Sequence, residues 1–209
     1  MSLRKTKTMR KTVFFAALAI LILACGSQKE KKNPPSQKLF EQLKAIGDNG
    51  VLFGHQDDLA YGVNWEYESG RSDTYETAGD YPALFGWELG GIELGQELNL
   101  DSVPFDTMRK LAIKGYQMGG VLTFSWHPYS PLDKTKSSWN TDEKVVKHIL
   151  PGGSHHDVFK NHLDRVADFF SSLKDENGQQ IPFIFRPWHE MDGSWFWWGS
   201  NLCTPAEFK

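Results

Sequence analysis

An apolar run that ends in a histidine and a carboxylate dominates the C-terminal part of the sequence and reads Ile181-Pro182-Phe183-Ile184-Phe185-Arg186-Pro187-Trp188-His189-Glu190. A short run of this kind, rich in β-branched and aromatic residues, is typical of a buried strand in a parallel sheet. A helical pattern from His156 to Lys174 precedes it, with Gly178 in the turn between them. The buried stripe of this helix is expected to comprise Val158, Phe159, Leu163, Val166, Phe169 and Phe170. A helix that leads into a buried strand predicts one unit of an α/β fold.

Three earlier apolar runs have the same form, which gives the chain four predicted strands. They extend from Val51 to His55, from Pro82 to Glu88 and from Gly120 to His127. Helical patterns alternate with these runs, one around residues 39–46 and another between Phe105 and Met118. Because strands and helices alternate, the predicted fold class is α/β with a parallel sheet. The form expected is a (β/α)8 TIM barrel, to which the family resemblance described below also points.

Each predicted strand ends in polar residues. The first ends at His55, the second at Glu88, the third at His127 and the fourth at His189 and Glu190. In TIM barrels the active site lies at the C-terminal ends of the strands. Any one of these residues could simply mark the point where the chain meets solvent. A histidine or glutamate at all four ends favours a shared site.

Four strand–helix units are only half of what a closed barrel needs, since a TIM barrel has eight units and about 250 residues. The last residues predict the start of a further helix, with Thr204 as its N-cap and Pro205 at its first position. We therefore expect residues 37–209 to be the N-terminal half of a (β/α)8 domain, truncated after about four units.

The first 36 residues have the composition of a targeting segment followed by a tether. Cationic residues at positions 4–11 precede an apolar run at positions 13–24, which is too short for a mature transmembrane helix. The run ends at Cys25 in a pattern that resembles a bacterial lipobox. We expect a signal peptide over residues 1–25, lipid on Cys25 and a flexible tether over residues 26–36. Ordinary signal cleavage and a buried helix are the alternatives.

Composition limits the kinds of partner. The 209 residues include eight tryptophans and carry a formal net charge of −3, without a long basic run. Nucleic acid is therefore not an expected partner. The surplus tryptophan serves either core packing or the binding of sugars, whose apolar faces stack on aromatic rings. Cys25 and Cys203 occur in such different contexts that pairing is not expected.

The strongest chemical signal lies between Arg186 and Gly199. It combines Glu190 at a strand end, a histidine beside it, and four tryptophans. A carboxylic acid, a hydrogen-bonding partner and flat aromatic surfaces together suit the cleavage of a glycosidic bond. Packing alone is a poorer explanation, because four such rings within about eleven residues cannot all point inward.

This stretch resembles the acid/base motif of glycoside hydrolase family 26, a family of (β/α)8 hydrolases with this glutamate at the end of strand four. The segments Leu52–Gln56, Gly86–Glu88 and Ser125–Pro128 resemble its early strands, so the resemblance covers most of residues 37–209. One departure is Asp192, where the family usually has asparagine. Most members are endo-acting β-1,4-mannanases, and a minority act on xylan or mixed-linkage glucan. The resemblance thus implies β-mannan as substrate and no cofactor.

The resemblance also implies roles for single residues. Glu190 would be the proton donor, and His189 would contact sugar or the catalytic carboxylate. Trp195 would stack on a sugar near the cleaved bond, and His127 would bind on the glycone side. Trp139 is carried over as a substrate-binding residue by residue type alone.

Retention of configuration requires two carboxyl groups, roughly 5 to 5.5 Å apart. In the family the nucleophile is a glutamate on strand seven, which lies outside this chain; Glu88, Glu93 and Glu97 are not assigned to that role. We therefore expect the 209-residue chain to be inactive alone. Arg186 is expected either to hold carboxylates by hydrogen bonds or to form a buried salt bridge.

Two other functions fit parts of the pattern. His55, His127 and His189 suggest a metal-dependent barrel hydrolase, but such enzymes usually bring paired histidines from the first strand, so no metal is expected. A non-catalytic glycan-binding surface lipoprotein would keep the aromatic residues without needing a glutamate at a strand end. Cys203 is expected to be a buried packing residue. The remaining histidines are expected on helix surfaces: His148, His155, His156 and His162.

Overall fold

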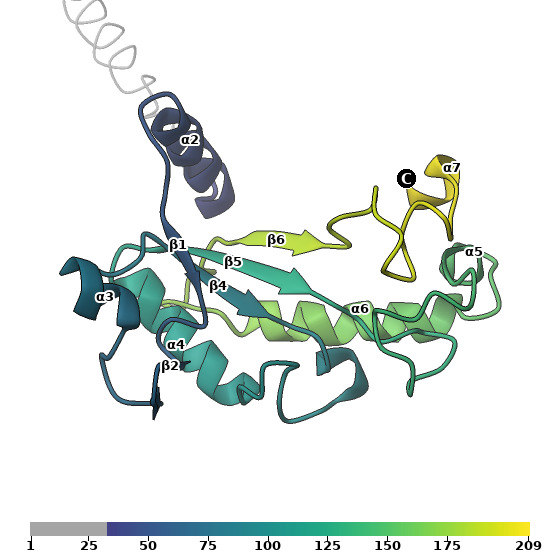
Figure 1. Cartoon of the computed structure of the whole chain (residues 1–209). Coiled ribbons are helices and arrows are strands. Elements are labelled where there is room, and N and C mark those ends of the chain that lie inside the picture. The colour runs from purple at the N-terminus through teal and green to yellow at the C-terminus, as the bar shows by residue number, and fades with distance from the viewer. Residues whose placement is uncertain (1–32) are drawn as a thin grey trace, which may run out of the picture. The chain divides into compact units, whose positions relative to one another are not determined.

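The computed structural model describes residues 33–209 and contains a four-stranded parallel sheet. Its strands are hydrogen-bonded in chain order (Figure 1): β1 (Gly54–Gln56), β4 (Leu84–Glu88), β5 (Val121–Trp126) and β6 (Ile184–Pro187). The α/β fold class with a parallel sheet is confirmed. The predicted signal peptide and most of the predicted tether lie outside the described residues.

The first and last strands are shorter than predicted. β1 begins only at Gly54, which pairs with Leu84, and Phe53 before it is 63% exposed. β6 ends at Pro187, because the next residue, Trp188, has a positive φ of 45° and cannot continue a strand. β1 and β6 are the outermost strands of the described sheet, so each pairs with one neighbouring strand instead of two.

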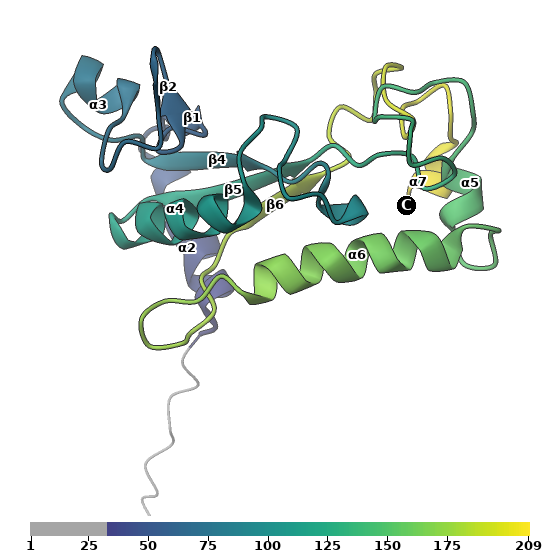
Figure 2. The same ribbon diagram turned by 90° about the horizontal axis from the view of Figure 1, so that it is seen from below.

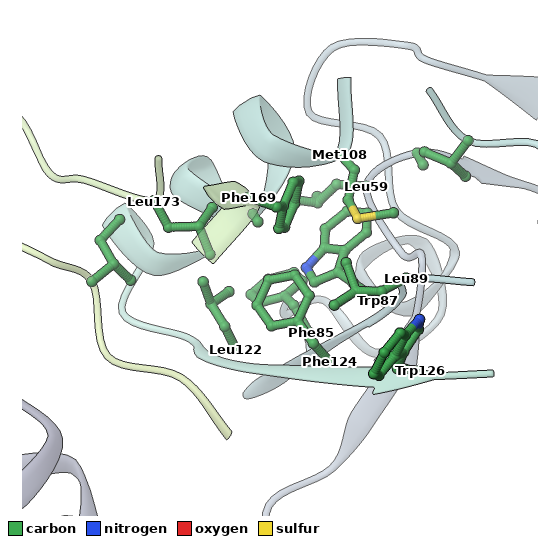
Figure 3. Packing of buried hydrophobic residues seen from close by; sticks show 14 of the residues in the cluster. Leu59, Phe85, Trp87, Leu89, Met108, Leu122, Phe124, Trp126, Phe169 and Leu173 are labelled. Carbon is green, nitrogen blue, oxygen red and sulfur yellow. The ribbon is translucent and has the colours of Figure 1, made fainter. Parts of the chain in front are cut away.

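Two helices cover one face of the sheet, α4 (Phe105–Gln117) and α6 (His156–Ser171). Figure 2 shows both helices running beside the strands. Figure 3 shows the side chains packed between the helices and the sheet. Burial of this apolar surface is the main source of stability here. The fully or almost fully buried residues of this core include Phe85, Trp87, Met108, Leu122, Phe124, Trp126 and Phe169.

The opposite face of the sheet is polar near the C-terminal ends of its strands. Successive residues of a strand point to opposite faces, so the neighbours of the buried aromatic residues face away from the helices. The register places Glu88 beside Ser125 and Ser125 beside Arg186. These three residues form one row across three strands, directly below the strand ends.

The connections between strands contain short elements that periodicity did not predict, because each is too short to display a period. An antiparallel pair and a short helix lie between β1 and β4, a 3₁₀ turn follows β4, and a single helical turn follows β5. They are β2 (Tyr61–Gly62), β3 (Trp65–Glu66), α3 (Asp73–Ala78), η1 (Ile92–Leu94) and α5 (Val146–Ile149).

The ends of the described chain are helical. α2 (Pro35–Gly47) begins two residues before the expected domain boundary, with a proline in its first turn. α7 (Pro205–Phe208) has the predicted cap, since Thr204 Oγ1 accepts a hydrogen bond from the backbone N–H of Glu207 at 3.3 Å. Within residues 33–209, no helix combines the length and apolar character needed to cross a bilayer.

Two predictions about α6 were wrong. Val158, expected on the buried stripe, is 40% exposed, because it lies about 100° around the helix from Phe159 and falls outside the packed stripe. His162 was expected at the surface but is 7% exposed, since it lies three residues after Phe159 and four before Val166, on the packed stripe. Burial, aided by the charge of Arg165, lowers the pKa of His162.

Candidate active site

The ends of β5 and β6 bring two predicted site residues into contact. His127 directly follows β5, and His189 follows β6 after one intervening residue. Their rings meet edge to face, with centroids 4.5 Å apart and planes at 89°. Burial and the neighbouring His127 lower the pKa of His189. A neutral imidazole at this position can donate one hydrogen bond and accept another.

An unusual backbone turn separates the side chains that follow β6. Trp188 and Glu190 have positive φ values of 45° and 56°, a conformation that is uncommon for residues with bulky side chains. The ring of Trp188 packs against Trp126 on the helix side of the sheet, at 5.8 Å. His189 lies instead against His127. Strained backbone of this kind is often retained where it orients a functional side chain.

The carboxylate of Glu190 is exposed and has one hydrogen-bond donor beside it. Trp195 Nε1 donates to Glu190 Oε2 at 2.9 Å, and the Trp195 side chain is itself 44% exposed. The loop folds back because the backbone N–H of Gly193 donates to the carbonyl of Glu190, and that of Ser200 to the carbonyl of Gly193. Gly199 packs so closely on the Gly193 carbonyl that a Cβ atom would not fit.

Phe196 is a central residue of the site that sequence reasoning missed. It is 2% exposed, and its ring lies 5.3 Å from that of His127 and 5.7 Å from that of His189. The ring of Trp139, which is 63% exposed, also packs against Phe196, at 4.8 Å. Phe196 thus joins the loops after β5 and β6. Its position between two tryptophans of the motif was the available signal.

The four tryptophans of the motif have different surroundings. Trp197 and Trp198 are each 1% exposed, and their indole N–H groups donate to the carbonyls of Pro128 and His189, both at 2.9 Å. These two rings fasten the loop to its neighbours. Trp188 is half-buried, so Trp195 is the motif's exposed indole. The expectation that the rings would not all point inward is confirmed.

Glu88, at the end of β4, is a buried carboxylate held by hydrogen bonds. Its Oε1 accepts from the backbone N–H groups of Gly90 at 2.7 Å and His127 at 2.8 Å. Its Oε2 accepts from the hydroxyl of Ser125 and lies 2.8 Å from His127 Nδ1. Burial opposes ionisation, but the hydrogen bonds and the charge of His127 outweigh it and lower the pKa of Glu88.

The loop after β4 is held by a second buried acid. Glu93 is 2% exposed, and its Oε2 accepts hydrogen bonds from the backbone N–H of Gly91 and from Trp126 Nε1. Its Oε1 accepts from the N–H of Tyr129 at 2.8 Å. Burial raises the pKa of Glu93. Together, Glu88 and Glu93 bind the loops after β4 and β5 to each other.

Arg186 lies in the polar row of the sheet, in register with Ser125. It is exposed, and within residues 33–209 it forms no salt bridge. The expectation of a buried salt bridge is therefore not what the structure shows. Its guanidinium contributes to the lowered pKa of His189, after burial and His127.

The end of β1 forms a separate cluster. His55 Nδ1 lies 3.2 Å from Asp58 Oδ1, which also accepts a hydrogen bond from the hydroxyl of Thr74 at 2.6 Å. His55 thus pairs with Asp58, whereas His127 pairs with Glu88. Among the described residues, no group of three or more histidine, cysteine, aspartate or glutamate side chains is arranged to hold a metal ion.

Cys203, expected to be buried, is only half-buried and packs beside the aromatic loop. Its thiol donates to the carbonyl of Trp198 at 3.3 Å, and burial raises its pKa. His148, His155 and His156 were expected on helix surfaces and are half-buried. His148 and His155 both lie 3.0 Å from the hydroxyl of Ser154. His156 faces the carbonyl of Ile149 at 2.8 Å.

Comparison with known proteins gives consistent matches. The family model described as "Glycosyl hydrolase family 26" matches residues 28–209. A mannan endo-1,4-beta-mannosidase of Bifidobacterium adolescentis is 34% identical over 178 residues, which is 83% of this chain and 17% of that protein. The enzyme of the same name from Bacillus subtilis (strain 168) is 49% identical over 158 residues, 73% of this chain and 41% of that protein.

Solved structures show the same likeness. A GH26 beta-mannanase from Bacteroides ovatus superposes with a TM-score of 0.81 at 44% sequence identity, covering 85% of this chain and 52% of that one. A modular endo-beta-1,4-mannanase from Cellulomonas fimi gives a TM-score of 0.73 at 32% identity, covering 83% of this chain and 40% of that one. The chain therefore spans about half, or less, of the length of the relatives it matches.

Proposed function

The chain belongs to glycosyl hydrolase family 26, as part of a (β/α)8 barrel domain, and from this membership we propose that the complete protein is a retaining hydrolase of β-1,4-mannosidic bonds. Its substrates would be mannan, glucomannan or galactomannan. The relatives described above that are 34% and 49% identical are both named mannan endo-1,4-beta-mannosidase, which supports mannan over xylan or mixed-linkage glucan.

The observation that carries this proposal is the environment of Glu190. Its carboxyl group is exposed at the end of β6 and accepts a hydrogen bond from the exposed indole of Trp195. Beside it lies the ring cluster of His127, His189 and Phe196. A glycosidic oxygen that reaches this position would meet a proton donor, and the sugar would meet aromatic surface.

In a retaining mechanism, Glu190 would protonate the departing oxygen while a second carboxylate attacks the anomeric carbon. Glu190 would then take a proton from the water that hydrolyses the glycosyl–enzyme intermediate. His189 and His127 would bind hydroxyl groups of the sugar in the cleaved position and on its glycone side. Trp195 and Trp139 would provide stacking surfaces, with the indole N–H of Trp195 also orienting the Glu190 carboxylate.

The second carboxylate is not Glu88 or Glu93. Both are almost fully buried, and both oxygens of each accept hydrogen bonds from the surrounding loops. A nucleophile needs an accessible oxygen lone pair, which neither of them offers. From the family resemblance we propose that this role belongs to a glutamate on strand seven of the complete barrel. The chain by itself would then release no reducing sugar from galactomannan. Turnover comparable to that of the complete enzyme would refute this assignment.

The test of the proposed function compares hydrolysis with binding. The complete protein is assayed for reducing-sugar release on galactomannan, xylan and mixed-linkage glucan, and for retardation in gels that contain each polysaccharide. Glu190→Ala should abolish hydrolysis of galactomannan and leave retardation intact. Asp164→Asn, which changes an exposed acid on α6, is the matched control. A wild-type protein that is retarded but releases no sugar would be a glycan-binding lipoprotein instead.

We also propose that the protein is exported and anchored by lipid on Cys25. The support is the sequence alone, a cationic start and an apolar run that ends in a pattern resembling a lipobox. In a bacterial host, the wild-type protein should sediment with membranes and partition into detergent. Cys25→Ser should shift it to the soluble fraction, and an unchanged distribution would argue against the anchor.

A further inference from the structure

The contact between Glu88 and His127 carries an inference that rests on the proposed function and deepens it. We propose that Glu88 is a positioning residue that keeps a proton on Nδ1 of His127. The other ring nitrogen, Nε2, is then the atom that meets a sugar hydroxyl. Glu88 itself touches no substrate, because its side chain is 4% exposed.

The first step is that Glu88 is ionised. Three hydrogen-bond donors contact its oxygens. Two are backbone N–H groups, those of Gly90 and His127, which can only donate. The third is the hydroxyl of Ser125. The Ser125 hydroxyl has a second acceptor in reach, the Trp87 carbonyl at 3.3 Å, but the shorter contact is to Glu88. Hydrogen bonds to a carboxylate favour its charged form, in agreement with the lowered pKa of Glu88.

The second step fixes the proton on the ring. An ionised carboxylate can only accept hydrogen bonds, so the nitrogen 2.8 Å from Glu88 Oε2 must be the donor. That nitrogen is Nδ1 of His127. A neutral imidazole has one N–H group, and the second nitrogen is then an acceptor. A carboxylate that orients an imidazole in this way recurs in catalytic and metal-binding sites.

The third step is that the ring cannot turn over. His127 is packed edge to face against His189 at 4.5 Å and against Phe196 at 5.3 Å, while its side chain keeps 25% exposure. Rotation by about 180° would place a C–H group against the charged Glu88 and leave that charge short of a donor. The exposed part of the ring is therefore expected to present Nε2 rather than Nδ1.

The consequence is a direction for one hydrogen bond. When His127 is neutral, a sugar hydroxyl must donate to its Nε2, and a ligand group that can only accept is rejected at this position. Two other groups act electrostatically on His127, His189 from the loop after β6 and Asp101 from the loop before α4. Among the described residues neither of them forms a hydrogen bond with Nδ1, so Glu88 is the group that holds the proton on that nitrogen.

The test reads the tautomer directly, by long-range ¹H–¹⁵N NMR of the full chain labelled on its histidines. At about pH 9, where histidines are ordinarily neutral, His127 should be in the Nδ1–H form. The variant His127→Asn assigns its signal. Glu88→Gln is nearly isosteric but places an amide N–H₂ where Oε2 was, so it should convert His127 to the Nε2–H form. A wild-type His127 in the Nε2–H form would overturn the proposal.

Two features keep this test decisive. If Glu88→Gln fails to fold, the wild-type tautomer by itself still decides, and Ser125→Ala serves as the milder variant. It removes one donor to Glu88 without introducing a competing one, so it should leave the Nδ1–H form in place. If Ser125→Ala converted His127 to the Nε2–H form, the tautomer would depend on the Ser125 hydroxyl rather than on the Glu88 carboxylate, and the proposal would be overturned. Because NMR needs no turnover, these results stand even if the proposed hydrolase activity fails.

A double-mutant cycle in the complete protein tests whether the role reaches catalysis. Glu88→Gln should lower kcat/KM on galactomannan about tenfold, the size expected for one misdirected hydrogen bond. In the His127→Ala background the same substitution should have almost no further effect, because Glu88 acts through His127. Equal losses in both backgrounds would show that Glu88 acts by another route and would overturn the catalytic part of the proposal.

Discussion

Glu88 and Glu190 are the same side chain at the ends of two strands of one sheet, and their environments are opposite. Glu88 is 4% exposed, with both oxygens occupied by hydrogen bonds. Glu190 is exposed and accepts one, from the indole of Trp195. A carboxylate already saturated with donors is suited to holding other groups in place. One that keeps free acceptor positions is suited to exchanging a proton with a ligand.

The difference arises from the chain that follows each residue. After Glu88 the backbone folds back, so that the N–H of Gly90 reaches the carboxylate only two residues away. Gly90 allows this because a Cβ there would overlap Leu100 and the carbonyl of His127. Glu190 instead has a positive φ of 56°, and the loop after it returns one indole and no backbone donor to the carboxylate.

The largest effect expected from this comparison is on activity, at Glu190. Glu190→Gln in the complete protein should lower kcat on galactomannan by about 10²- to 10⁴-fold, the usual contribution of a general acid and base. The melting temperature should stay within about 1 °C, because the side chain is exposed. An aryl mannoside with an acidic leaving group needs little protonation, so its first step should lose much less. Equal losses on both substrates would contradict the proton-donor role.

The second effect is on stability, at Glu88. Glu88→Ala should lower the free energy of unfolding by about 3 to 5 kcal/mol, because it leaves several buried donors without an acceptor. Chemical denaturation followed by tryptophan fluorescence measures this change. Glu190→Ala is the matched control and should cost less than about 0.5 kcal/mol. If the two substitutions cost the same, the distinction between a structural and an available carboxylate would fail.

The sequence was sufficient to predict that both glutamates lie at strand ends, but not which of them is buried. Strand ends follow from local runs of apolar residues, and four were found. Burial of Glu88 depends instead on Ser125 and His127, which are 37 and 39 residues away and reach it only through the register of β4 and β5. The position of Phe196 could not be predicted for a similar reason, because its neighbours come from the loops after β5 and β6, which meet only in the folded chain.

A third strand-end acid, Asp57 after β1, extends the comparison to pH. It is fully buried, its Oδ1 has no hydrogen-bond partner, and burial followed by the charge of Asp101 raises its pKa to about 7. The folded state therefore holds a proton that the unfolded chain releases near its ordinary pKa of 3.8. Its contribution to stability is complete below that value and is lost as the pH rises toward about 7.

Asp57→Asn should remove this pH dependence. Relative to the wild type, the variant should gain about 3 kcal/mol of stability between about pH 4 and about pH 7, since one pKa unit corresponds to about 1.4 kcal/mol. Denaturant titrations at both pH values measure the change. Glu190→Gln should leave the wild-type slope unchanged in the same experiment. A parallel pH dependence in wild type and Asp57→Asn would show that Asp57 is already ionised when folded.

The smallest expected effect comes from two indole N–H groups, one that donates to the exposed carboxylate of Glu190 and one that donates to a backbone carbonyl. Trp195 Nε1 donates to the exposed Glu190 carboxylate, and Trp198 Nε1 donates to the buried carbonyl of His189, both at 2.9 Å. Trp195→Phe keeps an aromatic ring and should lower kcat/KM about fivefold, the equivalent of about 1 kcal/mol, with little change in stability.

Trp198→Phe should show the opposite pattern, a loss of about 1 kcal/mol of unfolding free energy with a smaller change in kcat/KM. Both variants lose one N–H donor of the same chemistry, so the assay that responds identifies what each donor supports. If Trp195→Phe destabilised the fold as much as Trp198→Phe, the loop after β6 would be a structural unit throughout. Glu190 would then be held as firmly as Glu88, and the contrast between the two carboxylates would reduce to their solvent exposure.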